Sequence, residues 1–406
     1  MEIRSITYFC HPGAPLDPQV IRQAGEFVQT ARRQIEEAGF TVQTTRLATV
    51  PFPEYLPVDN PSQLIQSAQQ LEKAAGEHGF AYLALGPALP EAPASYAVIP
   101  NVLAATQNCF LSGVIADPQR GISLSAIQAC AEIIPQLAAH DPNGFGNLYF
   151  AALANVPAGA PFFPAAYHDS AEPAFAFALQ AADLAVQAFT GAGSLDEART
   201  DLISAVEQHA ARLEQVGERL ERQFGVHFRG LDFTLAPFPQ EAHSIGAALE
   251  ALGLPAFGLH GSLAASAFLT ECLDRAVYQR TGFNGLMLPV LEDAVLARRA
   301  AEGAFSLNEL LLYSAVCGTG LDTIPLPGDT SPGQLAAVLL DLAALALRLD
   351  KPLTARLMPI PGKAAGDPTG FDFPYFANSR IMTLRAQPLG RLWQSQSVLS
   401  LNSRRK

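Results

Sequence analysis

The sequence has little charge, few cysteines and no internal cluster of basic residues. Only 16% of its 406 residues are charged, 49% are hydrophobic, and the formal net charge is −12. Such a chain buries a large core, and its remaining apolar surface predicts a homo-oligomer. Nucleic acids and anionic membranes bind clustered Lys and Arg, yet the one basic run, "SRRK" (403–406), is terminal. We therefore expect neither as a partner.

The five cysteines lie far apart, without any Cys-x-x-Cys pair. An odd, scattered set does not match a disulfide framework or a structural zinc site. The first residues, "MEIRSITYFCHPG", pass from charges directly into a strand-like run, unlike a signal peptide. The most apolar helical stretch, 335–347, carries Asp341 in its middle, which membrane spans rarely tolerate. A cytoplasmic protein is the expectation.

Strand-like and helical segments alternate along the chain. Asp17 and Pro18 predict a helix start after the first strand, Gly39 predicts its end, and a long helix is predicted over 194–224. No low-complexity linker interrupts this alternation, which predicts one parallel-rich α/β layer or barrel. About ten strands are predicted, at 3–9, 41–47, 80–86, 109–116, 147–154, 174–179, 229–237, 255–259, 285–290 and 353–360.

Several separated sequence motifs together resemble those of an uncharacterised prokaryotic family, domain-of-unknown-function family 711. They are "ANVPAGAPFFPAAYH" (154–168), "GLDFTLAPFP" (230–239), "GLHGSLAA" (258–265), "LPVLED" (288–293), "CGTGLDTIPLPGDT" (317–330) and "RLMPIPGKAAGD" (356–367). The resemblance implies a ten-stranded α/β barrel of the pyruvate formate-lyase type. Such a barrel has two antiparallel five-stranded halves, helices outside and a finger loop inside. We expect one such domain over residues 1–406, with about the last 30 residues as a tail.

The segment 317–330 is predicted to be a loop, because it holds three glycines and two prolines between apolar helical stretches. The resemblance gives it the place of the finger loop, with Cys317 at the reactive position. Asp322 and Asp329 either cap turns or belong to a site. Buried carboxylates cost several kcal/mol unless paired, so we predict that Asp322 is buried against Arg356, Lys363, His260, amides or a cation.

The candidate catalytic residues are Asp322, His260, His168 and Cys317. His260 and His168 lie in family-like segments, and each is either a catalyst or a structural histidine. Cys317 is either a nucleophile or a small buried apolar residue.

Three further residues are candidates for binding substrate. Arg356 and Lys363 are either ordinary strand-end cations or ligands for a carboxylate or phosphate, and Asn155 either positions a carbonyl or caps a turn. Oxygen ligands for a divalent cation are available from Asp322, Asp329 and Glu292, although Glu292 also suits the first turn of a helix.

Glycyl-radical enzymes of this fold carry a carboxyl-terminal glycine in an Arg-Val-x-Gly-Tyr type motif. The late glycines, of which Gly390 in "QPLGRLWQS" is the nearest match, lie in no such context. We expect no glycyl radical, and no NAD or flavin. The first hypothesis is a non-radical, lyase- or hydrolase-like enzyme with acid–base chemistry on a small anionic metabolite, metal-assisted where a cation binds. The alternatives are a non-catalytic metabolite-binding or regulatory barrel and, third, a glycyl-radical enzyme.

Overall fold

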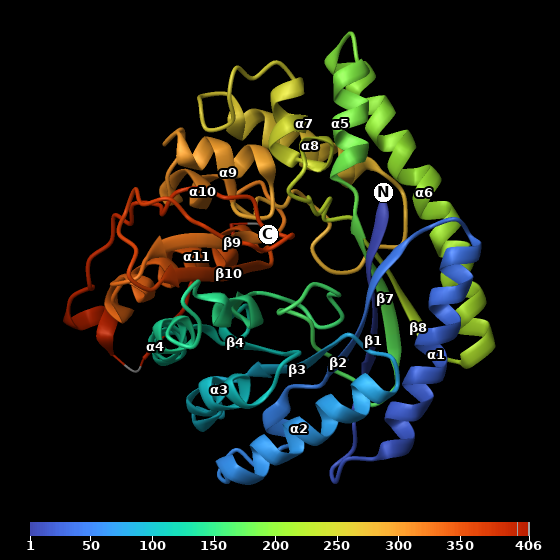
Figure 1. The fold of residues 1–406 in the computed structure, drawn as a ribbon, viewed down its shortest axis with the longest axis vertical. Helices are drawn as coiled ribbons and strands as arrows, with labels where there is room; N and C mark the ends of the chain where they lie inside the picture. Colours follow the sequence, from blue (N-terminus) through green and yellow to red (C-terminus); the bar gives the residue numbers. More distant parts are fainter. Residues whose placement is uncertain (396, 405–406) are drawn as a thin grey trace.

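A single mixed sheet of eleven strands organises the chain in the computed structural model, which describes residues 1–395 and 397–404. Its path is β8-β7-β1-β2-β3-β4-β6-β10-β9, with β5 attached to β4 and β11 to β5 (Figure 1). In chain order the strands are β1 (Glu2–Cys10), β2 (Val42–Thr49), β3 (Tyr82–Ala88), β4 (Cys109–Asp117), β5 (Gly121–Ser123), β6 (Phe150–Ala154), β7 (Ala174–Gln180), β8 (His227–Asp232), β9 (Gly320–Pro327), β10 (Leu353–Ile360) and β11 (Val398–Leu399).

The helices lie around the outside of this sheet (Figure 1). The predicted starts at Asp17-Pro18 and Ser194 are confirmed, since both side chains cap their helices. The helices are α1 (Pro18–Glu37), α2 (Pro61–Glu77), α3 (Ala94–Ala105), α4 (Leu124–Ala138), α5 (Ala182–Gly191), α6 (Leu195–Phe224), α7 (Ile245–Ala251), α8 (Ser262–Arg275), α9 (Ala294–Ala301), α10 (Leu307–Tyr313) and α11 (Pro332–Leu349), with short 3-10 turns at Phe52–Glu54, Phe145–Tyr149, Glu241–His243 and Arg391–Gln394.

Strand direction divides the sheet into a central block and two flanks. β1, β2, β3, β4 and β6 are parallel neighbours, which confirms the predicted parallel-rich α/β sheet. β7 runs antiparallel to β1, and β10 runs antiparallel to β6, while β8 and β9 are parallel to these two. The amino ends of the central block therefore lie at the same edge as the carboxyl end of β7.

The sheet is not closed into a barrel in the described residues. The segment 280–290 crosses between the outer strands β8 and β9 and makes one isolated bridge to each, Leu231 to Arg280 and Pro289 to Asp322. The strands predicted at 255–259 and 285–290 are wrong, since neither segment forms a strand. The buried carboxylate of Asp232, at the end of β8, accepts hydrogen bonds from the backbone amides of Phe283 and Asn284 in the crossing segment, both at 3.0 Å. These bonds satisfy amides that a sheet ladder would otherwise pair.

The prediction that 317–330 is a finger loop is also wrong, because Gly320–Pro327 forms strand β9. β9 pairs in parallel with β10, and it lies at the end of the sheet path. Proline is tolerated in an edge strand because one side needs no amide donor. The two prolines that suggested a loop are therefore compatible with the strand.

The loop at 155–168, between β6 and β7, covers the inner face of the sheet instead. Its Phe163 and Ala166 pack in one buried cluster with Phe9 and Phe110 and with alanines of β2, β3 and β7. Small alanine side chains on that face leave room for the phenylalanine ring. The interior is therefore filled by a different loop from the one predicted.

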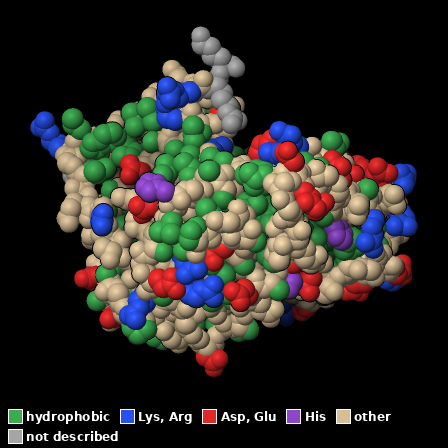
Figure 2. Space-filling view, turned by 90° about the horizontal axis from the view of Figure 1, so that it is seen from above, with side chains coloured by type: hydrophobic (Ala, Val, Ile, Leu, Met, Phe, Trp, Pro, Cys, Tyr) green, Lys and Arg blue, Asp and Glu red, His purple; other side chains and the backbone are tan. Residues whose placement is uncertain are grey.

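Helix α11 is long and apolar enough, by length and composition, to cross a membrane. Within the described part of the chain it contacts α4, β10 and β6, and its apolar stripe is buried in the core. A core helix of a soluble protein has the same properties. On the face shown in Figure 2, acidic and basic side chains are interspersed.

Asp293 joins two helices at the core. It is fully buried, caps α9 through the amides of Val295 and Leu296, and also accepts bonds from Ser244 and from the first amides of α7. Burial raises the pKa of this carboxyl, and the hydrogen bonds oppose the shift. Asp293 is therefore structural.

We expect Asp293→Asn to lower the free energy of unfolding by about 3 kcal/mol, because several buried donors lose a charged acceptor. Asp17→Ala, at the exposed cap of α1, is the control and should cost about 1 kcal/mol. Urea denaturation measures both. Equal costs would contradict the structural role of Asp293.

Candidate functional site

A β-bulge brings Asp322 and Arg356 together. Ala355 of β10 pairs with Leu321 of β9, and Leu357 pairs with Ile324. The two residues between them on β9, Asp322 and Thr323, therefore lie opposite a single residue of β10, Arg356. Thr323 has a left-handed φ of 46° in this bulge. Bulges re-aim side chains and occur often beside active sites. Here the bulge places the Asp322 carboxylate against the guanidinium, with Oδ1 2.5 Å from Nε and Oδ2 3.0 Å from the second nitrogen, Nη2.

Glu292 extends this pair into a network that reaches β1. One carboxylate oxygen accepts from Arg356 at 2.7 Å, and the other accepts from Arg4 at 2.7 Å. The Val290 amide bonds to the Asp322 carbonyl, which positions the segment carrying Glu292. Arg4 lies at a second register shift, where β1 has one more residue than β7: Ile3 pairs with Leu179 and Ser5 with Ala178, so Arg4 has no residue opposite it on β7. Two irregular positions in the sheet thus supply the two arginines around one carboxylate.

The ionisation of this network follows from burial and pairing. Burial raises the pKa of Glu292 while the charges of Arg356 and Arg4 lower it, and the net shift is downward. Burial raises the pKa of Asp322 against the opposing charge of Arg356. Because both Asp322 oxygens accept N–H bonds from Arg356, the ionised carboxylate is the form that the geometry supports. The two carboxylates in turn raise the pKa of Arg356, against the effect of its burial.

Arg46, on β2, is a third arginine at the same place, and it forms no ion pair with a carboxylate in the part of the chain that the structure describes. It is only 9% exposed, and its one side-chain hydrogen bond in residues 1–395 and 397–404 goes from Nε to Thr44. Its guanidinium carbon lies 5.0 Å from the Phe163 ring centre and 5.8 Å from that of Tyr82. Burial, followed by the charge of Arg4, lowers its pKa to about 9. The charge of Glu292 opposes this shift in pKa, but no described carboxylate forms an ion pair with Arg46.

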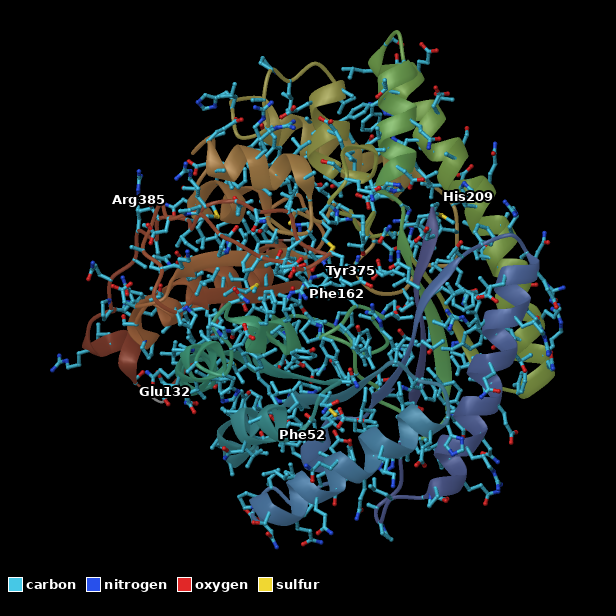
Figure 3. The ribbon with its side chains drawn as sticks, viewed as in Figure 1. Phe52, Glu132, Phe162, His209, Tyr375 and Arg385 are labelled. Atoms are coloured by element: carbon cyan, nitrogen blue, oxygen red, sulfur yellow. The ribbon has the colours of Figure 1, made fainter. Side chains whose placement is uncertain are left out.

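These residues line a central cavity of about 220 Å³. Arg4, Arg46, Glu292 and Arg356 form its charged wall, whereas Asp322 lies behind Arg356. In Figure 3, Phe162 and Tyr375 lie near the middle of the ribbon, while Glu132, His209 and Arg385 lie at its periphery. The aromatic lining residues are Tyr82, Phe110, Tyr149, Phe162, Phe163, Phe373, Tyr375 and Phe376.

Comparison with known proteins places the chain in a family. The family model described as "Uncharacterised ACR (DUF711)" matches residues 1–376. The chain belongs to this family. A UPF0210 protein of Pyrobaculum arsenaticum is 34% identical over 364 residues, which are 83% of this chain and 78% of the relative. UPF0210 proteins of Methanococcoides burtonii and Oleidesulfovibrio alaskensis are 30% and 29% identical, over 86% and 87% of this chain and 80% and 82% of their own.

The expected membership of family 711 is thereby confirmed, and the whole central cavity lies inside the matched residues. Of the residues singled out from the sequence, three meet at this cavity: Asp322, Arg356 and Glu292. The predicted burial of Asp322 against Arg356 is confirmed.

Asp329, Lys363 and His260 do not join this group. Asp329 is exposed after the end of β9, roughly 16 Å of strand beyond Asp322. The structure therefore does not assemble the three predicted oxygen ligands of a metal. Ser331, not Asp329, caps α11. His260 is exposed before α8, and Lys363 is half-buried in the turn after β10.

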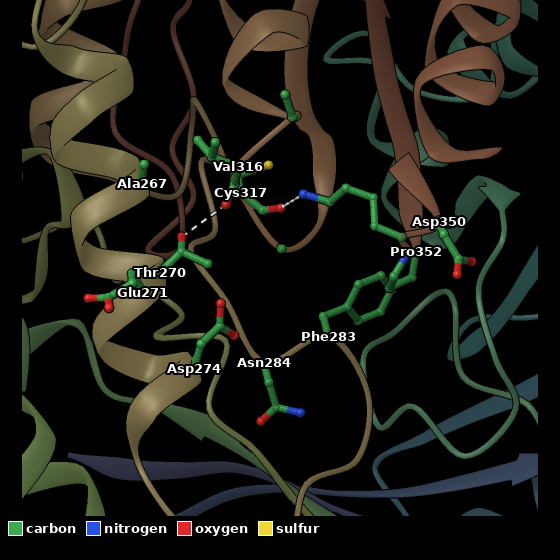
Figure 4. A pocket seen from close by; sticks show the side chains of 13 residues that line it. Ala267, Thr270, Glu271, Asp274, Phe283, Asn284, Val316, Cys317, Asp350 and Pro352 are labelled. Atoms are coloured by element: carbon green, nitrogen blue, oxygen red, sulfur yellow. Dashed lines mark hydrogen bonds between the residues drawn. The ribbon is translucent and has the colours of Figure 1, made fainter. Parts of the chain in front are cut away.

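Cys317 lines a different pocket, shown in Figure 4, and Asn155 bonds to a residue of that pocket's wall. The buried Cys317 lines it, and its carbonyl accepts a bond from Lys351. Thr270 donates to the Val316 carbonyl at 2.9 Å. Asn155 donates to Asp350, which also lines this pocket. Cys317 therefore lies before β9 and away from the arginine network.

His168 is buried beneath a third pocket, near the carboxyl ends of β2 and β4. Its Nε2 lies 2.8 Å from the Glu172 carbonyl, and burial lowers its pKa. Burial therefore favours the neutral ring, and its buried Nδ1 has no hydrogen-bond partner in the described residues.

Arg4, Arg46 and the aromatic lining were not predicted from the sequence. One signal was available for Arg46, because an arginine within the strand-like run "TVQTTRL" must be buried if that strand lies in a parallel block. The sequence held no comparable signal for Arg4, since its position depends on a register shift between β1 and β7. Neither residue lies in a sequence motif that carries the family resemblance.

We expect Asp322→Asn to destabilise the protein by about 3–5 kcal/mol, because it removes one partner of a buried ion pair. Asp329→Asn is the matched control in the same segment and should stay within about 0.5 kcal/mol of the wild type. Thermal and urea unfolding test both variants. Equal stability of the two variants would show that the bidentate pair is not the stabilising contact.

Proposed function

We propose that the protein binds a small organic anion in the central cavity and acts on it as a non-radical enzyme by acid–base chemistry. The observation that carries the proposal is Arg46, a buried guanidinium that lines the cavity and has no carboxylate partner in the described chain. Guanidinium groups bind carboxylates and phosphates through two parallel hydrogen bonds. An anion at this place would supply the counter-ion that the fold does not.

The energetics favour a ligand rather than a purely structural role for Arg46. Burying an unpaired charge is costly, and the lowered pKa of Arg46 expresses that cost. Arg356 illustrates the contrast, since two carboxylates satisfy it and its pKa is raised. Stacking on Phe163 and Tyr82 compensates the Arg46 charge only partly.

The groups available for proton transfer in the cavity are the phenols of Tyr82, Tyr149 and Tyr375 and the carboxylate of Glu292. Burial raises the pKa of Tyr149, so its phenol holds its proton at neutral pH. Binding without catalysis is the second candidate function. It is favoured by the positions of His168, His260 and Cys317, which lie outside the cavity.

We also propose that the sheet is a variant of the ten-stranded barrel of the pyruvate formate-lyase type, within one domain that ends in a carboxyl-terminal tail. Two observations support it: the five-stranded parallel block, and the antiparallel direction of both flanks. The segment 280–290, with one bridge to each outer strand, would occupy the tenth position.

We expect Arg46→Met to weaken anion binding by about 30-fold or more, because the cavity loses its unpaired charge. Isothermal titration calorimetry with acetate, succinate, benzoate and inorganic phosphate identifies the anions that bind the wild type. Arg385→Met changes an exposed, peripheral arginine and should leave the affinities unchanged. If none of the anions binds, or if both variants weaken binding equally, the proposal is wrong.

Anion affinity should also fall as the pH rises through about 9, the pKa of Arg46 in the empty cavity. The anion binds the protonated guanidinium, so above that pKa Arg46 must take up a proton before the anion can bind. The affinity then falls by up to about tenfold per pH unit. Titrations from about pH 7 to about pH 10 measure this slope, and Arg46→Met should abolish it. A slope that persists in the variant would assign the titration to another group.

A further inference from the structure

We infer that the ligand of the central cavity is a monocarboxylate built on a single aromatic ring. The inference rests on the proposed function and narrows it to one class of substrate. It is drawn from the charge, the lining and the volume of the cavity.

The charge of the cavity matches one negative charge. Three guanidinium groups meet there, those of Arg4, Arg46 and Arg356. Two carboxylates, Glu292 and Asp322, bond to Arg4 and Arg356. One positive charge therefore remains, and it belongs to Arg46, the arginine without a partner. A second negative charge on a ligand would lie beside Glu292 without a cation of its own, which disfavours dianions such as dicarboxylates.

The rest of the lining is unusually aromatic. Eight aromatic side chains line the cavity, and Phe110 contacts the rings of Tyr82, Tyr149 and Phe163 with centres 4.9 to 5.3 Å apart. Among the other lining residues, Phe373 contacts Tyr375 and Phe376, with ring centres 5.3 and 5.2 Å apart. Aromatic pairs prefer edge-to-face and offset arrangements that stabilise them beyond the area they bury. A ligand ring placed among these walls gains such contacts, whereas an aliphatic body does not.

The volume of the cavity sets the size of the ligand. An apolar cavity of about 150 Å³ holds benzene. The 220 Å³ available here therefore accommodates one six-membered ring with a carboxylate and a small substituent. A nucleotide or a two-ring compound would have to protrude through the mouth of the cavity or displace its walls.

The orientation of the ligand follows from the positions of these groups. The carboxylate would face Arg46, and the ring would extend toward Phe162 and Tyr375, which lie near the centre of the molecule (Figure 3). Tyr375 is 49% exposed, so it stands at the mouth of the cavity. The ring of Phe162 also lies 6.0 Å from the guanidinium carbon of Arg356. Phe162 therefore lies beside the charged wall, within reach of the ligand ring.

Isothermal titration calorimetry of the full chain with four probes tests the inference: benzoate, cyclohexanecarboxylate, succinate and inorganic phosphate. We expect benzoate to bind at least tenfold more tightly than each of the other three. Equal affinity for cyclohexanecarboxylate would overturn the aromatic ring, and tighter binding of succinate or phosphate would overturn the monocarboxylate. Either result leaves the proposed anion site in place. If none of the four probes binds, the proposed function falls with the inference.

Variants of the wall give an independent test. Phe162→Leu should reduce the preference for benzoate over cyclohexanecarboxylate at least threefold, and Tyr375→Leu, at a half-exposed position, provides the same test if the first variant does not fold. Trp393→Leu is the control, since Trp393 is 44% exposed and lines a different groove. An unchanged preference in a folded Phe162 or Tyr375 variant, or an equal change in the control, would overturn the placement of the ring.

Discussion

A buried guanidinium needs negative charge around it, and the centre of this structure depends on how that need is met. Arg356 on β10 takes one carboxylate from β9 and another from Glu292, just after the crossing segment, and Glu292 binds Arg4 on β1 as well. Three parts of the sheet that are far apart in sequence are therefore held by one ionic network. The network also links β9 and β10 to β1, and no strand ladder joins them to β1 in the described residues.

The same constraint makes Arg46 informative. In a fold that supplies two carboxylates to the buried Arg356 and one to the partly buried Arg4, Arg46 is buried without a carboxylate within ion-pair distance in the described residues, which carries a cost in stability. Stability alone gives no reason to keep the charge there. Residues that are unfavourable for folding are often those required for ligands, because a site is designed for the bound state.

Irregular positions in the sheet create this site. Regular alternation would turn successive side chains of β9 to opposite faces, but the bulge at Asp322 and Thr323 redirects the carboxylate toward Arg356. Alanines on the inner faces of β2, β3 and β7 leave space that Phe163 and its loop occupy. The aromatic lining then comes from that loop, from the strands and from the segment after β10.

The sequence was sufficient to predict a parallel-rich α/β sheet, from the alternation of segments and the helix caps at Asp17 and Ser194. It was also sufficient to predict the membership of family 711, from the motifs that resemble this family. The burial of Asp322 against Arg356 was also predictable, because a carboxylate and a guanidinium inside an apolar chain have to pair. The strand nature of 320–327 was not, because its glycines and prolines are compatible with a loop until β10 provides a partner at the sheet edge. The strand-like run around Arg46 indicated its burial, but the meeting of Arg4, Arg46 and the aromatic rings at one cavity was decided by tertiary structure, since register shifts and long-range contacts leave no periodic signal in the residues themselves.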